Sequence, residues 1–209
     1  MRELKVVAPE LRLDPERALD GLDWTEVFGE PGRVEIEIGP GKGKFLVEAA
    51  STRPDVHMLG VDWANKYLRM VEGKALRAEL KNVRFIRIDA KEFVHRAVPE
   101  HSVSAYYVFY PDPWPKKRHH KRRFFQPPTI DDLSRTLIHG AYLHVATDFR
   151  GYWEHLEPLL DAHADFERQA AFGSPEFPVP TDQPLTNFEA KYLVQGRDRF
   201  RGSWRRKDA

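Results

Sequence analysis

Short apolar runs alternate along this chain with segments whose apolar residues recur at helical spacing. Runs of this length are typical of buried strands. We predict such strands at residues 34–38, 58–61, 83–88, 103–110 and 141–146. The segments between them predict helices at residues 45–50 and about 64–78, a helix that follows Pro127-Pro128 and runs to about Ile138, and a helix up to Leu160. Strands that alternate with helices are typical of an α/β fold with a mostly parallel sheet.

The C-terminal third continues this pattern less regularly. Gly140 stands where a helix usually ends, so we predict that it closes the helix before it. A short strand is predicted at residues 166–171 and a proline-rich loop at residues 173–185. A helix at residues 186–194 follows, and the arginine-rich residues 197–207 are predicted to form an edge strand and a tail. We therefore expect seven strands, with helices on both faces of the sheet.

Length and composition favour a single domain. The 209 residues suit one domain with a full core, and weak periodicity before Pro31 predicts an N-terminal arm at residues 1–30 and one domain at residues 31–209. The chain has no cysteine, and its nine histidines show no metal-ligand spacing, so we expect neither disulfides nor a bound metal. It has no apolar leader and no apolar run of about 18 residues. We therefore expect a cytoplasmic protein without a membrane partner.

Positive charge is concentrated in residues 116–123, which we call the basic block. The block carries six lysines and arginines, whereas the whole chain has a net charge of only +1. Cations gathered at one place favour a polyanionic partner, and nucleic-acid phosphates are the commonest. The alternative is a solvated charged loop. The cations expected to hold phosphates without reading bases are Lys117, Arg118, Lys121, Arg122 and Arg123.

A glycine-rich turn between the first predicted strand and its helix is a candidate cofactor site. Residues 37–43 read Glu-Ile-Gly-Pro-Gly-Lys-Gly, and Gly39 and Gly41 let a backbone approach a ligand closely. Their spacing matches neither a phosphate-binding Walker A loop nor G-x-G-x-x-G. Acids follow at three successive strand ends, Glu37, Asp62 and Asp89, and Asp62 lies where an acid accepts hydrogen bonds from ribose hydroxyls. The alternative role for each acid is a helix N-cap.

The fourth predicted strand ends in Tyr-Pro-Asp-Pro-Trp-Pro at residues 110–115. Alternating prolines keep this loop extended and direct Asp112 and Trp114 toward the strand ends. The segment resembles the Asp-Pro-Pro-aromatic motif of nucleic-acid N-methyltransferases. The alternative is a rigid turn that carries a surface tryptophan.

Taken together, these motifs resemble those of the bacterial tRNA (guanine-N7)-methyltransferases over roughly residues 33–195. The strings that carry the resemblance are E-I-G-x-G-x-G from residue 37, Y-P-D-P-W-P-K-K-R-H from residue 110, T-D from residue 147 and T-N-F-E-x-K from residue 186. The resemblance implies a Rossmann-like class I methyltransferase fold, S-adenosylmethionine as the methyl donor and guanosine 46 in the tRNA variable loop as the target. We expect a monomer or homodimer, and nothing in the sequence implies a protein partner.

The resemblance also implies which residues bind each ligand. The implied cofactor contacts are Glu37, Gly39, Gly41, Asp62, Asp89 and Asp112. The implied substrate contacts are Lys116, Asp148, Thr186, Asn187, Phe188 and Glu189. Two departures stand out: Asp62 occupies a position where the family more often has Glu, and residues 197–201 are more basic than the apolar strand expected there.

The chemistry of guanine N7 assigns roles to the acids. N7 carries a lone pair and no proton, so methyl transfer needs no general base, and positioning dominates the rate. The base becomes cationic during transfer, so a nearby carboxylate stabilises the transition state. Asp112 is the catalytic candidate, with Asp148 as the alternative, and Asp148 or Glu189 is expected to accept from the Watson–Crick edge. Trp114 either stacks on a base or packs in the core.

Two other classes of protein fit part of the pattern. An NAD(P)-dependent oxidoreductase also has strand-end glycines and acids, but the glycine spacing differs and the chain shows no set of residues for hydride transfer. A non-enzymatic RNA-binding domain explains the basic block, but acids at the strand ends would repel RNA. Methyl transfer to tRNA accounts for both features.

Overall fold

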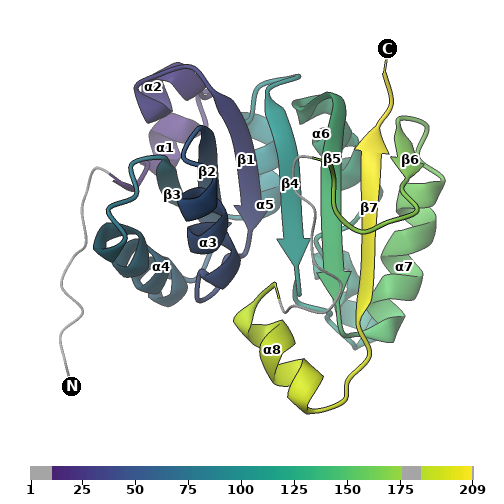
Figure 1. The fold of residues 1–209 in the computed structure, drawn as a ribbon. Coiled ribbons are helices and arrows are strands. Elements are labelled where there is room, and N and C mark those ends of the chain that lie inside the picture. The colour runs from purple at the N-terminus through teal and green to yellow at the C-terminus, as the bar shows by residue number, and fades with distance from the viewer. Residues whose placement is uncertain (1–10, 176–184, 209) are drawn as a thin grey trace. The chain divides into compact units, whose positions relative to one another are not determined.

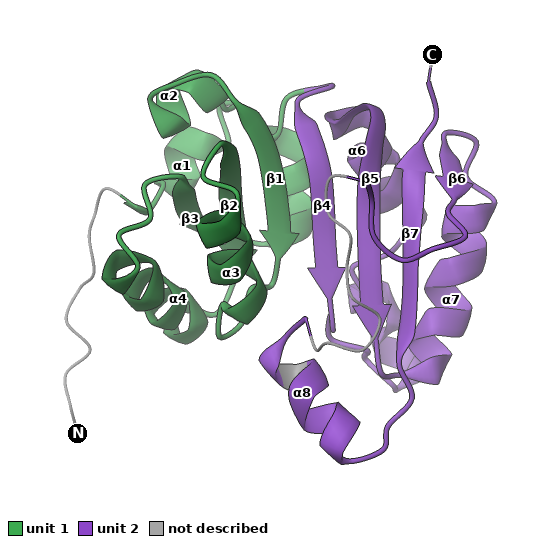
Figure 2. Cartoon of the chain, viewed as in Figure 1, with its two compact units in different colours: residues 1–99 green, residues 100–209 purple. Residues whose placement is uncertain are grey.

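The computed structural model of the chain describes residues 11–175 and 185–208. The chain divides into two compact units, residues 1–99 and residues 100–209 (Figure 2). Each unit has a group of strands connected by helices (Figure 1).

Three parallel strands form the centre of unit 1, in the order β3-β2-β1. They are β1 (Arg33–Ile38), β2 (Val56–Asp62) and β3 (Val83–Arg87). All residues of β2 except the last are buried, as expected for a parallel strand covered on both faces. Because the strands are parallel, their carboxyl ends meet at one edge of unit 1.

A helix follows each strand of unit 1; the hydrophobic pattern predicts those after β1 and β2 but not the one after β3. These helices are α3 (Lys44–Thr52), α4 (Asn65–Arg77) and α5 (Ala90–Glu92), the last continuing into a π-helical turn, Phe93–Ala97. Leu68, Val71 and Ala75 of α4 are fully buried, which confirms the apolar face predicted from their spacing.

The segment before β1 packs onto unit 1 where it is described. It forms two short helices, α1 (Pro15–Ala18) and α2 (Trp24–Phe28), each begun by an aspartate cap. Leu11, Ala18 and Phe28 are buried. The boundary expected after residue 30 stays a prediction.

Four strands form the centre of unit 2, in the order β4-β5-β7-β6. They are β4 (Val103–Phe109), β5 (Leu137–Thr147), β6 (Phe166–Arg168) and β7 (Phe200–Arg206). β4 and β5 are parallel, whereas β7 is antiparallel to both β5 and β6. The described residues of the two units therefore contain seven strands, mostly parallel, and the predicted fold class is confirmed.

The helices of unit 2 are α6 (Pro127–Thr136), α7 (Arg150–Asp161) and α8 (Asn187–Val194), and Lys117–Arg122 forms a 3-10 helix, η3. α7 packs on β5, β6 and β7. α8 lies near the carboxyl end of β4 (Figure 1), where the rings of Tyr110 and Tyr192 are 5.9 Å apart. Most of the proline-rich loop predicted at residues 173–185 lies outside the described residues.

Two sequence predictions for unit 2 are wrong. Gly140 does not close α6, which ends at Thr136; it lies inside β5 with a φ of 78°, where the pairing with β4 shifts register. A helix end and a strand irregularity both favour a glycine with positive φ, so the local signal is the same. The arginine-rich segment forms an inner strand of unit 2, because β7 pairs with β5 on one side and with β6 on the other.

Candidate functional site

The predicted cofactor residues of unit 1 gather at the carboxyl ends of its strands. Glu37 is the last but one residue of β1, and Asp62 is the last residue of β2. Asp89 follows β3 and caps α5. Adjacent parallel strands therefore bring the three acids to the same edge of unit 1, as the sequence predicts.

Glu37 is the most unusual of these acids. Its side chain is buried, at 1% exposure, and its Oε2 atom has no hydrogen-bond partner among the described residues. The pKa of Glu37 is raised to about 8, mainly by burial and also by the charge of Asp62, while a hydrogen bond from the Leu46 backbone opposes the shift. A buried carboxyl group without a basic neighbour favours a cationic ligand.

Glu35, two residues earlier on β1, has the opposite environment. It is equally buried, but its carboxylate pairs with Arg53 at 2.8 Å. The sequence shows the two glutamates as equivalent alternating positions of one strand. Among the described residues, Glu35 has an arginine partner, whereas Glu37 Oε2 has no hydrogen-bond partner, and this difference separates a structural ion pair from a candidate binding group.

The glycine turn leaves its backbone accessible at one position. Gly39 has a φ of 74°, and a Cβ atom added there would meet no other atom within 4 Å. Gly41 also has a positive φ, of 52°. Gly43 is required for another reason, because a Cβ atom there would collide with Val71 of α4. The turn therefore combines open backbone beside Glu37 with tight packing at the start of α3.

Asp62 and Asp89 hold the local backbone. Asp62 Oδ1 accepts from the Ala64 backbone at 2.7 Å. Asp89 Oδ1 accepts from the backbones of Lys91 and Glu92, so the capping role is confirmed for Asp89. An ionised carboxylate has about four acceptor positions, so neither contact excludes a ligand hydroxyl.

In unit 2, the loop at residues 110–115 holds Asp112 between two strained residues. Tyr110 and Trp114 have φ values of 55° and 43°, in the left-handed region that bulky residues avoid. Each such residue costs about 1 to 3 kcal/mol and persists only where surrounding contacts impose it. Asp112 itself is exposed. The strain is thus concentrated on both sides of the predicted catalytic carboxylate.

The basic block divides into outward and inward side chains. Lys116, Lys117, Arg118, Lys121 and Arg122 are exposed, as phosphate contacts require. Arg122 also lies 5.0 Å above the half-buried ring of Trp114, and His119 meets the same ring edge-on at 5.6 Å. Trp114 therefore packs against the block itself.

Arg123 differs from the expectation of a phosphate contact. Only 2% of it is exposed. Its Nε donates to the Pro113 carbonyl at 2.9 Å and its Nη1 to the Gly151 carbonyl at 3.3 Å. A side chain buried on backbone carbonyls cannot reach a phosphate, so this assignment is corrected.

The start of α8 forms the expected cap. Thr186 Oγ1 accepts from the Glu189 backbone at 3.1 Å. Glu189 is fully buried; its Oε2 accepts from the Leu185 backbone at 2.6 Å, and its Oε1 accepts from Arg201 Nε at 2.9 Å. The carboxylate predicted to read guanine is therefore held by the protein in this structure. Asn187 is exposed at the first residue of the helix, and the side chain of Phe188 lies outside the description.

Asp148 is also held by an arginine. It follows β5 directly and accepts from Arg197 Nη1 at 2.9 Å, with 18% of its side chain exposed. Both candidate base-reading acids of unit 2 thus pair with arginines of residues 197–201. In the sequence, the only sign of these arginine partners was that residues 197–201 are more basic than expected for a strand.

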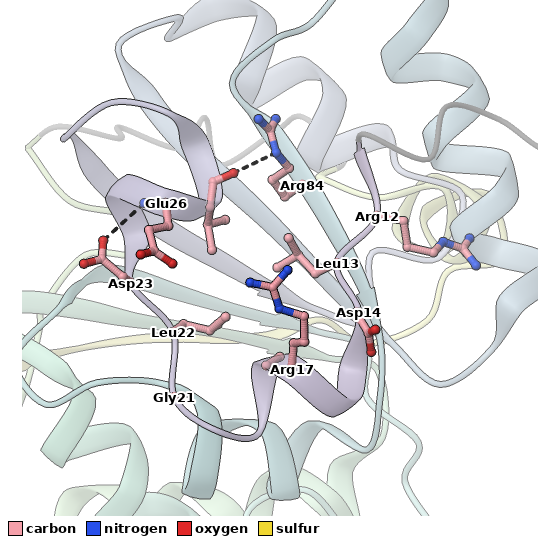
Figure 3. Close-up of a pocket in the computed structure, with 11 residues that line it drawn as sticks. Arg12, Leu13, Asp14, Arg17, Gly21, Leu22, Asp23, Glu26 and Arg84 are labelled. Carbon is pink, nitrogen blue, oxygen red and sulfur yellow. Dashed lines mark hydrogen bonds between the residues drawn. The ribbon is translucent and has the colours of Figure 1, made fainter.

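One described cavity lies elsewhere in unit 1. It has a volume of about 380 Å³, and its lining includes Arg12, Arg17 and Glu26 together with Arg84 of β3 (Figure 3). Figure 3 also shows the hydrogen bond from Arg84 to the Val27 carbonyl, at 3.0 Å. None of the predicted site residues lines it.

In the described residues, no group of three or more His, Cys, Asp or Glu side chains could hold a metal. None of the described helices has both the length and the apolar character needed to cross a membrane.

Comparison with known proteins determines the family. A family model described as "Putative methyltransferase" matches residues 32–202. A tRNA (guanine-N(7)-)-methyltransferase of Halorhodospira halophila is 39% identical over 93% of this chain and 84% of its own length. One of Alkalilimnicola ehrlichii is 34% identical over 99% of this chain and 86% of its own length. The chain belongs to the tRNA (guanine-N7)-methyltransferase family.

Solved structures support the fold of this tRNA (guanine-N7)-methyltransferase family member. The 16S rRNA methyltransferase KamB has a TM-score of 0.61 at 15% identity, covering 88% of this chain and 93% of that one. An antibiotic-related methyltransferase has a TM-score of 0.58 at 18% identity and covers 98% of both chains. At these identities the likeness concerns the fold alone.

S-adenosylmethionine is the cofactor of this methyltransferase class, and unit 1 has features that fit it. The ligand carries a sulfonium and an ammonium group, and Glu37 offers a buried oxygen atom without a partner. The open backbone at Gly39 provides room for close approach. The cofactor assignment made from the sequence is confirmed at the level of the family.

Proposed function

We propose that this chain transfers the methyl group of S-adenosylmethionine to N7 of guanosine 46 in the variable loop of tRNA. The observation that carries the proposal is the junction at residues 112–123. There an exposed carboxylate, held in a strained loop, is followed directly by five exposed cations. Family membership supports the reaction, and the target position rests on the motif resemblance.

Unit 1 is proposed to hold the cofactor. When bound, S-adenosylmethionine supplies an activated methyl group on a cationic sulfur. Glu37 would face positive charge on the ligand, and Asp62 would accept from ribose hydroxyls. The backbone at Gly39 and Gly41 would approach the ligand, with Asp89 at the next strand end. Asp112 is also proposed as a cofactor contact.

Asp112 is proposed to act in the transition state. Guanine N7 attacks with its own lone pair, so no residue has to remove a proton. Positive charge then spreads over the base, and a carboxylate beside it stabilises this charge in proportion to how well it is already oriented. Tyr110 and Trp114, on either side of Asp112, have left-handed backbone conformations, which we propose help to orient its carboxylate.

The substrate would be held by two kinds of contact. Lys117, Arg118, Lys121 and Arg122 would neutralise phosphates and set the position of the tRNA. The contacts proposed for the guanosine are Lys116, Asp148, Thr186, Asn187, Phe188 and Glu189. Asp148 is the more accessible of the two acids, and accepting from guanine N1–H and N2–H would require it to exchange its bond with Arg197.

Identification of the modified base tests the proposal. Purified protein would be incubated with S-adenosylmethionine and tRNA transcripts, and borohydride reduction followed by aniline cleavage would report N7-methylguanosine at its position. A transcript in which adenosine replaces guanosine 46 is the matched control, and we expect no cleavage from it. Methylation at an exocyclic amine would refute the reaction, and cleavage at another guanosine would refute the target position.

The setting of the reaction is proposed on the same basis. We expect the enzyme to act on tRNA in the cytoplasm, as a monomer or homodimer, without another protein. Methylation by the purified chain alone tests the last point, and light scattering during turnover would report the oligomeric state.

A further inference from the structure

The loop that carries Asp112 has few backbone N–H groups that could fix it. Three of its six residues are prolines, which have no N–H group to donate. Tyr110 donates its backbone N–H to the Ala146 carbonyl at 2.7 Å, which holds one end of the loop. The strained Trp114 lies at the other end. Some other group has to hold that end against its strain.

Arg123 supplies this contact. Its Nε donates to the carbonyl of Pro113, the residue between Asp112 and Trp114. Its Nη1 donates to the Gly151 carbonyl in α7, and its Nη2 lies 3.1 Å from His120 Nε2. The guanidinium carbon lies 5.0 Å above the ring of Tyr152, itself fully buried in α7. One side chain thus connects the loop to α7 and to η3.

The chemistry of arginine suits this role. A guanidinium group presents several donors in a fixed plane and stacks on aromatic rings, whereas a lysine is a single mobile charge. The Nε and Nη1 atoms of Arg123 donate to carbonyls on two separate segments of the chain, and a lysine cannot reproduce both hydrogen bonds in this geometry. Arg123 is therefore not equivalent to the exposed arginines before it.

Resting on the proposed function, we infer that Arg123 is a positioning residue for Asp112: it holds the strained catalytic loop through the Pro113 carbonyl and does not contact tRNA. The basic block then has two functions. Its exposed cations attract phosphates, and its last, buried arginine orients the catalytic carboxylate.

A pair of charge-removing variants separates the two functions. Arg123→Met and Arg118→Met each remove one cation of the block and keep a similar aliphatic stem. For Arg123→Met we expect kcat to fall roughly 10- to 100-fold, the size of effect that a displacement of about 1 Å at a reacting centre produces. We expect KM for tRNA and the salt dependence of tRNA binding to remain unchanged.

Arg118→Met is expected to do the opposite. Loss of one phosphate contact should lower the log–log salt slope by roughly 0.7 to 0.9 and raise KM for tRNA, with kcat preserved. Arg123→Lys completes the set, because it restores charge without the planar fork, and kcat should remain well below that of the parent. A reduced salt slope with normal kcat in Arg123→Met would overturn the inference, as would full activity in Arg123→Lys.

Folding is controlled separately. Melting temperature and circular dichroism would establish whether Arg123→Met is folded. If it is not, His120→Asn replaces it as the test variant, because it removes the half-exposed ring that faces Arg123 Nη2. This variant should lower kcat in the same direction by a smaller factor, without a change in salt slope, and normal kcat would contradict the inference. Failure of the parent protein to methylate tRNA would instead refute the proposed function, so the two failures are distinguishable.

Discussion

Glu37 makes the binding of S-adenosylmethionine depend on pH in a way that the structure specifies. Burial raises its pKa to about 8, so the carboxyl group is protonated at neutral pH in the ligand-free chain. A cationic ligand favours the ionised form. Binding near neutral pH should therefore release a proton from Glu37.

The size of the effect follows from the difference between the pH of the solution and the pKa of Glu37. Ionising a group one pH unit below its pKa costs about 1.4 kcal/mol, or tenfold in affinity. If binding requires full ionisation of Glu37, affinity should rise by about 50-fold from pH 6 to pH 8 and level off above pH 8 at about 100 times its value at pH 6, since each pH unit below the pKa costs about tenfold. This is an upper limit, reached only when the ligand binds the ionised form exclusively.

Glu37→Gln is the matched variant, because it keeps the size of the side chain and cannot ionise. The ligand's own amino group titrates near pH 8. The ratio of the two dissociation constants, parent over variant, removes this contribution. Isothermal titration calorimetry at pH 6, 7, 8 and 9, in two buffers of different ionisation enthalpy, gives both the affinities and the number of protons released. A ratio that does not change with pH, or binding without proton release at pH 7, would refute this account of Glu37.

Three other perturbations test separate parts of the site. Asp112→Asn should lower kcat far more than it weakens cofactor binding, because a group that stabilises charge in the transition state acts mainly there; normal kcat at saturating cofactor would make Asp112 a turn residue only. Without ligand, Glu37→Gln should make the free energy of unfolding less dependent on pH. Because the folded pKa of Glu37 is raised from 4.5 to about 8, the parent loses stability as pH rises between these two values, by up to about 1.4 kcal/mol per pH unit. Identical pH profiles of parent and variant in urea denaturation would contradict this. Glu189→Gln should lower the free energy of unfolding by up to about 3 to 5 kcal/mol, the range for removing one partner of a buried ion pair. Glu48→Gln, at an exposed ion pair within a helix, should change it by less than about 1 kcal/mol. Equal urea midpoints for the two variants would show that the ion pair of Glu189 with Arg201 contributes no stability.

Much of the fold follows from the sequence, for a local reason. Burial repeats every second residue in a strand and about every 3.6 residues in a helix, so neighbouring residues encode these elements together. The apolar positions of α4 and the buried run of β2 lie where the pattern predicts them. Parallel strands then bring Glu37, Asp62 and Asp89 to one edge of unit 1.

Local signals fail where one residue type serves two conformations. Gly140 satisfies a positive φ in a strand as well as it would at a helix end. The arginines of β7 suggested an exposed edge, yet Arg201 is neutralised by Glu189 and Arg206 donates to the Leu137 carbonyl. Contacts with distant residues allow these cations to lie in an inner strand.

The sequence by itself determined the family, the order of strands and helices, and the chemistry present at each strand end, because short motifs and periodicity express these directly. Only the tertiary structure decided the state of individual charged groups. Glu35 and Glu37 share a strand, but Glu35 pairs with Arg53 whereas Glu37 Oε2 has no hydrogen-bond partner in the described part of the chain. Arg122 and Arg123 are adjacent, but Arg122 is exposed and Arg123 is buried. Charge state and role depend on burial and on partners far along the chain, and packing alone brings those partners into contact.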